Sequence, residues 1–370
     1  MWTPAPLQRT LSAALRDLGS STVDARLGAI RDLLVYIDHP NGITIEDATT
    51  RLLEILARDD AANVRAAAAS ALGEIEAKEA VDGLLAALSD RDAFVEQMSV
   101  LALGEIGDRR ALPAIRTRLT SDKAAVRYQA IVAFAAMADG ESVHEALRDS
   151  LCDEDASIRY ISLRLIEERI DKTLSCKVDR ATWAPLLDAY TEAISNLPAS
   201  TASSKPSMRP AGSTPSLSND EQVAFAIVRA KLGDRSCEPV LLSVIEGRLE
   251  SSSEDESAVF DLVGELELTA WIPKLETIAF GVLSPFRAAE RKGLALATLA
   301  RFGHPKAIAA IEALLNSFRP TRRTEGAFLA GKGHLVSLKE VIAELHGIDE
   351  NVRVETLRML STAKRTRTWC

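Results

Sequence analysis

The chain has 370 residues, of which 47% are hydrophobic and 26% charged, and it carries a net charge of −9. This hydrophobic share suffices for a continuous core, but aromatic residues make up only 5%, so small and aliphatic side chains must fill it. The acidic balance counts against binding to nucleic acid or anionic membrane by the chain as a whole. No apolar run approaches the roughly 18 residues that cross a membrane, and the first residues lack a secretory signal, so we expect a cytoplasmic protein.

A repeated phrase organises the first half of the chain: an acidic turn, a branched apolar residue usually followed by arginine, and then an alanine-rich stretch. The branched residues Val64, Val95, Val126 and Ile158 recur at intervals of 31, 31 and 32 residues. After each of them, mainly apolar or small residues follow at i+4, i+7, i+8 and i+11, the spacing that gathers one face of an α-helix. Shorter apolar segments between these stretches complete helix pairs. The sequence therefore predicts an all-α fold, an α-solenoid of about ten antiparallel helix pairs.

The expected ends of the longer helices carry polar and glycine signals. A carboxylate just before a helix can accept the free N-terminal amides, and glycine often follows the last turn. We expect the caps to come from Asp90 or Asp92, from Asp122, and from Asp153 or Asp155. Gly104 and Gly107 are expected to help end the helix that begins near Val95.

At this point the chain resembles the HEAT-repeat family, in particular its short bacterial version that also occurs in phycobilisome lyases. The resemblance is carried from about residue 43 to 170 by Asn63-Val64-Arg65, Leu72-Gly73-Glu74-Ile75 and Leu103-Gly104-Glu105-Ile106-Gly107-Asp108. It returns as Pro285-Phe286-Arg287, Phe302-Gly303-His304-Pro305 and Asp349-Glu350-Asn351-Val352-Arg353. The family resemblance implies a HEAT-like superhelix with a concave surface lined by the second helix of each pair.

A segment rich in Ser, Thr, Ala and Pro interrupts the repeats from Pro198 to Asp220. Such composition has no helical period and is typical of disordered spacers. We therefore expect N-terminal HEAT-like repeats at 1–197, a disordered Ser/Pro-rich linker at 198–220 and C-terminal HEAT-like repeats at 221–370. A docking or phosphorylation role for the linker serines stays open.

Only fragments of catalytic or ligand-binding motifs are present. Gly326–Gly333 follows a phosphate-binding loop up to Lys332, but Gly333 stands where a Ser or Thr would bind magnesium, and no strand precedes it. The glycines are better explained as the end of a repeat helix. The five histidines and four cysteines lack metal-ligand spacing, and His144-Glu145 is the one His-Glu pair, whereas the HEAT-repeat deoxyhypusine hydroxylases carry several around two irons. We therefore expect no enzyme activity, no cofactor and no metal site.

Superposing the repeats places two rows of side chains beside the apolar face. One row holds Arg65, Glu96, Arg127 and Arg159, and the other holds Ala66, Gln97, Tyr128 and Tyr160. For the arginines of the first row, the family resemblance favours structural bonds to acidic turns. Tyr and Arg are enriched at binding hot spots, although Tyr128 and Tyr160 could equally pack against the next repeat. The candidate partner-binding residues are Glu96, Gln97, Arg127, Tyr128, Arg159 and Tyr160.

The function that fits these features is a non-catalytic HEAT-repeat scaffold or adaptor that binds a protein partner through its concave face. Two alternatives stay open. One is a lyase-type HEAT protein that handles a small ligand or chromophore. The other is a DNA-binding HEAT-like protein that uses the basic end from Arg319 to Cys370, where ten Lys or Arg face six Asp or Glu. That basic end could also seat an acidic partner, although a solvated basic surface is the favoured explanation.

Overall fold

The structure of the protein, a computed structural model, describes residues 10–37, 39–173, 180–196, 217–281 and 288–366. Within them the chain is a succession of α-helices and short 3-10 turns, and the β pairing consists of one isolated bridge between Ile37 and Ile43. The predicted all-α solenoid is confirmed. Contacts divide the chain into two compact units, Met1–Leu217 and Ser218–Cys370.

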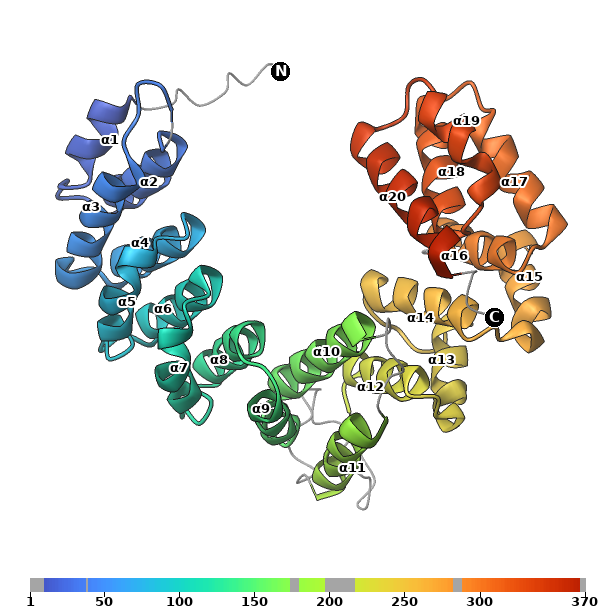
Figure 1. The fold of residues 1–370 in the computed structure, drawn as a ribbon, viewed down its shortest axis with the longest axis horizontal. Helices are drawn as coiled ribbons and strands as arrows, with labels where there is room; N and C mark the ends of the chain where they lie inside the picture. Colours follow the sequence, from blue (N-terminus) through green and yellow to red (C-terminus); the bar gives the residue numbers. More distant parts are fainter. Residues whose placement is uncertain (1–9, 38, 174–179, 197–216, 282–287, 367–370) are drawn as a thin grey trace, which may run out of the picture. The chain divides into compact units, whose positions relative to one another are not determined.

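Unit 1 is built from consecutive helix pairs (Figure 1). Its elements are α1 (Leu11–Asp17), α2 (Val23–Val35), α3 (Ile45–Arg58), α4 (Ala62–Glu74), η1 (Lys78–Ala80), α5 (Val81–Ala87), α6 (Ala93–Ile106), η2 (Arg109–Ala111), α7 (Leu112–Arg118), α8 (Ala124–Met137), α9 (Glu141–Leu151), α10 (Ala156–Thr173) and α11 (Arg180–Asn196). The predicted apolar phases are buried, as Val64, Val95 and Val126 show with no exposed surface. Ser99 occupies one of these phases, and its hydroxyl is satisfied because Oγ donates to the carbonyl of Val95 at 2.8 Å.

Unit 2 repeats the same scheme in the second half of the chain. Its elements are α12 (Asn219–Lys231), η3 (Arg235–Cys237), α13 (Glu238–Ile245), α14 (Ser253–Glu265), η4 (Thr269–Trp271), α15 (Ile272–Phe280), α16 (Ala288–Arg301), α17 (Pro305–Leu315), α18 (Pro320–Lys332), η5 (Val336–Leu338), α19 (Lys339–Glu344) and α20 (Glu350–Thr366). Ser218 and Glu221 form a capping box that starts α12. The expected linker at 198–220 lies outside the described residues up to position 216, as do Pro285-Phe286-Arg287, and the expected division into domains stays a prediction.

Close packing of the second helices curves the stack in unit 1. Gly73 and Gly104 lack the Cβ atom that would lie 2.7 Å from Ala102 Cα and 3.1 Å from Ala133 Cα, respectively. Small residues thus bring α4 close against α6 and α6 close against α8, whereas α5 and α7 make little contact with each other (Figure 1). Because the second helices are the closer set, the row of α4, α6, α8 and α10 is the concave side of unit 1.

The ends of the repeat helices differ in part from expectation. Asp92 caps α6 by accepting from Phe94 N, and Asp155 accepts from Ser157 N, so both predicted caps are confirmed. The prediction for Asp122 is wrong, because Lys123 is the N-cap residue of α8 and makes no side-chain cap. Gly107 ends α6 with a left-handed φ of 70°, as predicted. Gly104 does not end it, because it lies inside the helix at the close approach to Ala133.

Candidate partner-binding surface

A row of arginines in unit 1 joins each acidic turn to the next. Arg65 donates Nε and one NH₂ group to the two carboxylate oxygens of Asp90, both at 2.8 Å, and Arg127 does the same to Asp153 at 2.8 Å. Arg26 occupies the equivalent place against Asp59, with Nε 2.8 Å from the carboxylate. Bidentate charge-assisted bonds of this kind fix both partners in one geometry. The arginine row therefore locks the turns of neighbouring repeats.

Electrostatics support this locking role. The hydrogen bond from Arg65 lowers the pKa of the Asp90 carboxyl and, reciprocally, the bond to Asp90 raises the pKa of Arg65. The bond to Asp153 likewise raises the pKa of Arg127. The bond between Arg65 and Asp90 therefore favours the charged forms of both groups, and the bond to Asp153 favours the charged form of Arg127.

Glu96 occupies the position that Arg65 and Arg127 hold in their repeats, but its side chain is negatively charged. Its carboxylate is 7% exposed and lies 2.8 Å from Arg118 Nε and 3.0 Å from Lys123 Nζ. Lys123 belongs to the turn before α8, which corresponds to the turn that supplies an aspartate in the neighbouring repeats. An ion pair thus still joins the neighbouring repeats, but here the acid lies on the helix and the base lies in the turn.

Arg159 completes the row with carbonyl acceptors. It is 4% exposed, and its guanidinium donates to the carbonyls of Asp153 at 2.8 Å and Glu154 at 2.9 Å. Three of the six candidate partner-binding residues, Glu96, Arg127 and Arg159, are therefore buried with their charged groups engaged inside the chain.

The other three candidates, Gln97, Tyr128 and Tyr160, follow one another on α6, α8 and α10 as half-buried side chains. They lie on the concave side, beside the buried row, so the structure brings them onto one surface. This surface has apolar members that the sequence analysis missed. Phe94 is 49% exposed, and Met98, Leu101 and Val132 are partly exposed.

A sequence signal for these additional residues existed. Met98 and Leu101 are large apolar residues that fall outside the repeated buried phases of α6, and Val132 does so in α8. We define the concave surface by its partly exposed members: Phe94, Gln97, Met98, Leu101, Tyr128, Val132 and Tyr160. An apolar surface carrying tyrosines suits protein recognition.

The segment that follows the phosphate-loop pattern forms no such loop. Gly326–Lys332 lies inside α18, and Gly333 is its C-cap residue, so the backbone amides belong to a helix and not to an anion-binding loop. Lys332 Nζ donates to Ser257 Oγ at 2.6 Å and to Asp261 Oδ2 at 2.5 Å, both on α14. The lysine thus ties two second helices of unit 2 together.

Histidine and cysteine side chains occupy ordinary packing positions where the structure describes them. The ring of His144 meets that of Trp183 edge to face, and Glu145 pairs with Arg116 at 3.0 Å. Cys152 is exposed and Cys237 is buried, while Cys176 and Cys370 lie outside the described residues. Burial raises the pKa of the Cys237 thiol to about 11. Across the described ranges no three His, Cys, Asp or Glu side chains gather as a metal site would require.

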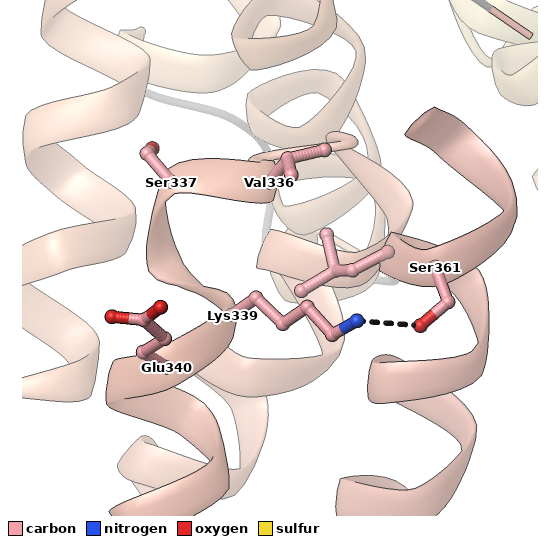
Figure 2. Close-up of a pocket in the computed structure, with 6 residues that line it drawn as sticks. Val336, Ser337, Lys339, Glu340 and Ser361 are labelled. Carbon is pink, nitrogen blue, oxygen red and sulfur yellow. Dashed lines mark hydrogen bonds between the residues drawn. The ribbon is translucent and has the colours of Figure 1, made fainter. Parts of the chain in front are cut away.

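A hollow of about 340 Å³ lies between η5, α19 and α20 of unit 2. Figure 2 shows Lys339 reaching across it to Ser361, where Nζ donates to Oγ at 2.9 Å. Glu340 also lines this hollow. The lining lacks the convergent polar groups that are typical of a small-molecule site. None of the described helices is long and apolar enough to cross a bilayer.

The architecture defines the class as an α-solenoid of stacked helix pairs, and sequence comparison names the repeat. Residues 49–135 match HEAT repeats, and the chain is a HEAT-like repeat protein. No curated protein matches the chain as a sequence relative.

Several solved structures match the chain over most of its length at low similarity. An engineered protein is 17% identical over 96% of this chain and 98% of its own, with a TM-score of 0.39. The complex of CpcE and CpcF of phycocyanin lyase from Nostoc is 15% identical over 98% of each chain, with a TM-score of 0.35. Human deoxyhypusine hydroxylase in complex with glycerol is 16% identical over 88% of this chain and 96% of its own, with a TM-score of 0.31. At these scores the similarities carry no argument about function.

Proposed function

We propose that this chain is a non-catalytic HEAT-repeat scaffold that binds a protein partner through the concave surface of α6, α8 and α10. The observation that carries the proposal is the row of half-buried Gln97, Tyr128 and Tyr160 beside partly exposed Met98 and Leu101. Large apolar and aromatic side chains on one continuous face are the groups that supply binding energy in protein interfaces.

The support beneath this surface favours preorganised binding. Buried ion pairs of Glu96 and Arg127 hold the turns of consecutive repeats, and Arg159 binds carbonyls of the same turn that Arg127 reaches. A rigid surface loses little conformational entropy when a partner docks. We therefore assign positioning roles to Glu96, Arg127 and Arg159, and partner contact to Gln97, Tyr128 and Tyr160.

The test is affinity capture from the native cell extract with mass spectrometry, using the full chain and the double variant Tyr128→Ala with Tyr160→Ala. If the two tyrosines are interface anchors, their truncation costs about 2 kcal/mol or more of binding energy, and the partner is lost. Because both side chains are half-buried on the concave surface of α8 and α10, their truncation should leave the helical circular dichroism spectrum unchanged.

A matched control distinguishes binding at this surface from non-specific binding to exposed apolar side chains. Phe328→Ala with Val354→Ala removes two apolar side chains of unit 2 that are 40% and 60% exposed. The control should capture the partner as the unchanged chain does. Full capture by the tyrosine variant would show that the site is assigned wrongly, and recovery of a pigment or of nucleic acid in its place would favour the ligand-handling or DNA-binding alternatives.

A further inference from the structure

Unit 2 has a strongly exposed aromatic residue at the turn between α17 and α18. Phe318 is 84% exposed, and the guanidinium of Arg319 lies 5.5 Å from its ring centroid. This contact holds an apolar and a cationic group side by side on the surface. An exposed aromatic of this kind is a candidate contact for another molecule.

Three arginines lie close together in the sequence at this turn, and one of them has a counterpart in unit 1 that pairs with a carboxylate. The segment Asn316–Arg323 contains Arg319, Arg322 and Arg323 and no acidic residue. Arg323 occupies the place in its repeat that Arg65 holds in unit 1, but it donates to the carbonyls of Ser317, Phe318 and His346. None of the three arginines forms an ion pair with a carboxylate of the described residues. Their positive charge is therefore uncompensated locally, in a chain whose net charge is −9.

A shallow groove of about 580 Å³ adjoins the turn and supplies apolar contact. Its lining includes Leu315, Val341 and Leu345, of which Val341 is 47% exposed. Arg323 forms part of the wall and fixes it, because Nε donates to the carbonyl of His346 at 3.0 Å. Arg319 is the N-cap residue of α18 and Arg322 lies in its first turn, so both cations belong to the start of this helix.

We propose that this surface, defined by Phe318, Arg319, Arg322 and the groove of Leu315, Val341 and Leu345, binds an acidic peptide segment of a partner protein. Carboxylates of the segment pair with Arg319 and Arg322, and an apolar side chain enters the groove beside Phe318. Charge complementarity selects this occupant, because it neutralises the arginines that the chain leaves without acids.

Nucleic acid fits the same surface less well. The apolar lining of the groove offers nothing to phosphates, whereas it can take up an apolar side chain of a peptide. The arginines form one compact group and not a basic track of the kind that follows a phosphate backbone.

The experiment measures fluorescence anisotropy of a labelled peptide that alternates glutamate and leucine, titrated with the full chain at low and high salt. A peptide with lysine in place of every glutamate and a short DNA duplex serve as comparison probes. We expect the acidic peptide to bind, salt to weaken the binding, and Arg319→Ala with Arg322→Ala to weaken it at least about tenfold. Phe318→Ser should weaken it in the same way.

Matched controls make each outcome decisive. Arg358→Ala removes an arginine of α20 whose side chain is 73% exposed and paired with Glu355, and it should leave the affinity unchanged. The Tyr128 and Tyr160 double variant should also bind normally, since this surface is independent of the concave one. Failure of the acidic peptide to bind, equal weakening by Arg358→Ala, or tighter binding of DNA through the same arginines would overturn the proposal.

Discussion

The substitution Arg127→Ala tests whether the arginine row locks the repeats or contacts a partner. The guanidinium makes two bonds of 2.8 Å to Asp153 and one of 2.8 Å to the carbonyl of Ser121. The side chains of Arg127 and Asp153 are 10% and 11% exposed. Removing one partner of a buried pair costs about 3–5 kcal/mol, because the other charge is left without compensation. Asp153 keeps the amide of Asp155, so we expect the lower end, about 3 kcal/mol.

The assay is native-state hydrogen exchange of the amides in α8–α10. Stability in a solenoid is a sum of repeat and nearest-neighbour terms, so the loss should concentrate in the repeats that Arg127 joins. A loss of about 3 kcal/mol accelerates exchange through local opening roughly 150-fold. Arg148→Ala is the matched control, because that side chain is 53% exposed and should change stability by less than about 0.5 kcal/mol.

The double variant Arg127→Ala with Asp153→Ala should be less destabilised than the sum of the single variants, because it leaves no unpaired charge. Unchanged exchange in Arg127→Ala, together with loss of partner capture, would refute the structural role and make Arg127 a binding residue.

Three further predictions concern the same stack. The bond to Arg65 lowers the pKa of Asp90. The stability from this pair is therefore present above the ordinary aspartate pKa of 3.8 and is lost as the pH falls through the lower folded-state value. Acid titration followed by circular dichroism should show this loss, and Asp90→Asn should reduce it. Gly104→Ala should destabilise the chain by about 1–3 kcal/mol in urea unfolding, because overpacking against the α8 backbone outweighs the gain in helix propensity. Glu96→Arg should destabilise the chain by placing a third cation in the ion-pair group, and adding Lys123→Asp should recover thermal stability by restoring the polarity of the neighbouring repeats.

Controls for these predictions come from the same repeats. Gly83→Ala in α5 would meet only the flexible end of Leu53, with Cδ2 2.5 Å from the new Cβ, so it should cost less than Gly104→Ala. An equal or larger cost at Gly83 would contradict the packing argument. For the charge reversal, failure of Lys123→Asp to rescue Glu96→Arg would show that the pair is not equivalent to the others. For the titration, a loss of stability at acid pH that is the same in the Asp90→Asn variant would show that Asp90 does not cause it.

The class of fold and the buried phases of the repeated helices could be predicted from the sequence. Val64, Val95 and Val126 are at the predicted positions because each repeat carries its own 3.6-residue period, which needs no knowledge of distant contacts. The same local information placed Gln97, Tyr128 and Tyr160 in one row. Whether that row binds a partner stays a prediction that the capture experiment tests.

The tertiary structure alone decided which of the marked side chains are engaged internally. Arg127 and Asp153 are 26 residues apart, and their bond forms only when neighbouring repeats stack at a particular distance. The same stacking explains why Gly104 lies inside a helix, since its role depends on how closely α8 approaches. Arg323 differs from these residues: it occupies the place that Arg65 holds in unit 1, but in the folded turn it donates to carbonyls and not to a carboxylate. Contacts between repeats depend on the spacing and orientation of whole helices, and a local sequence pattern does not contain that information.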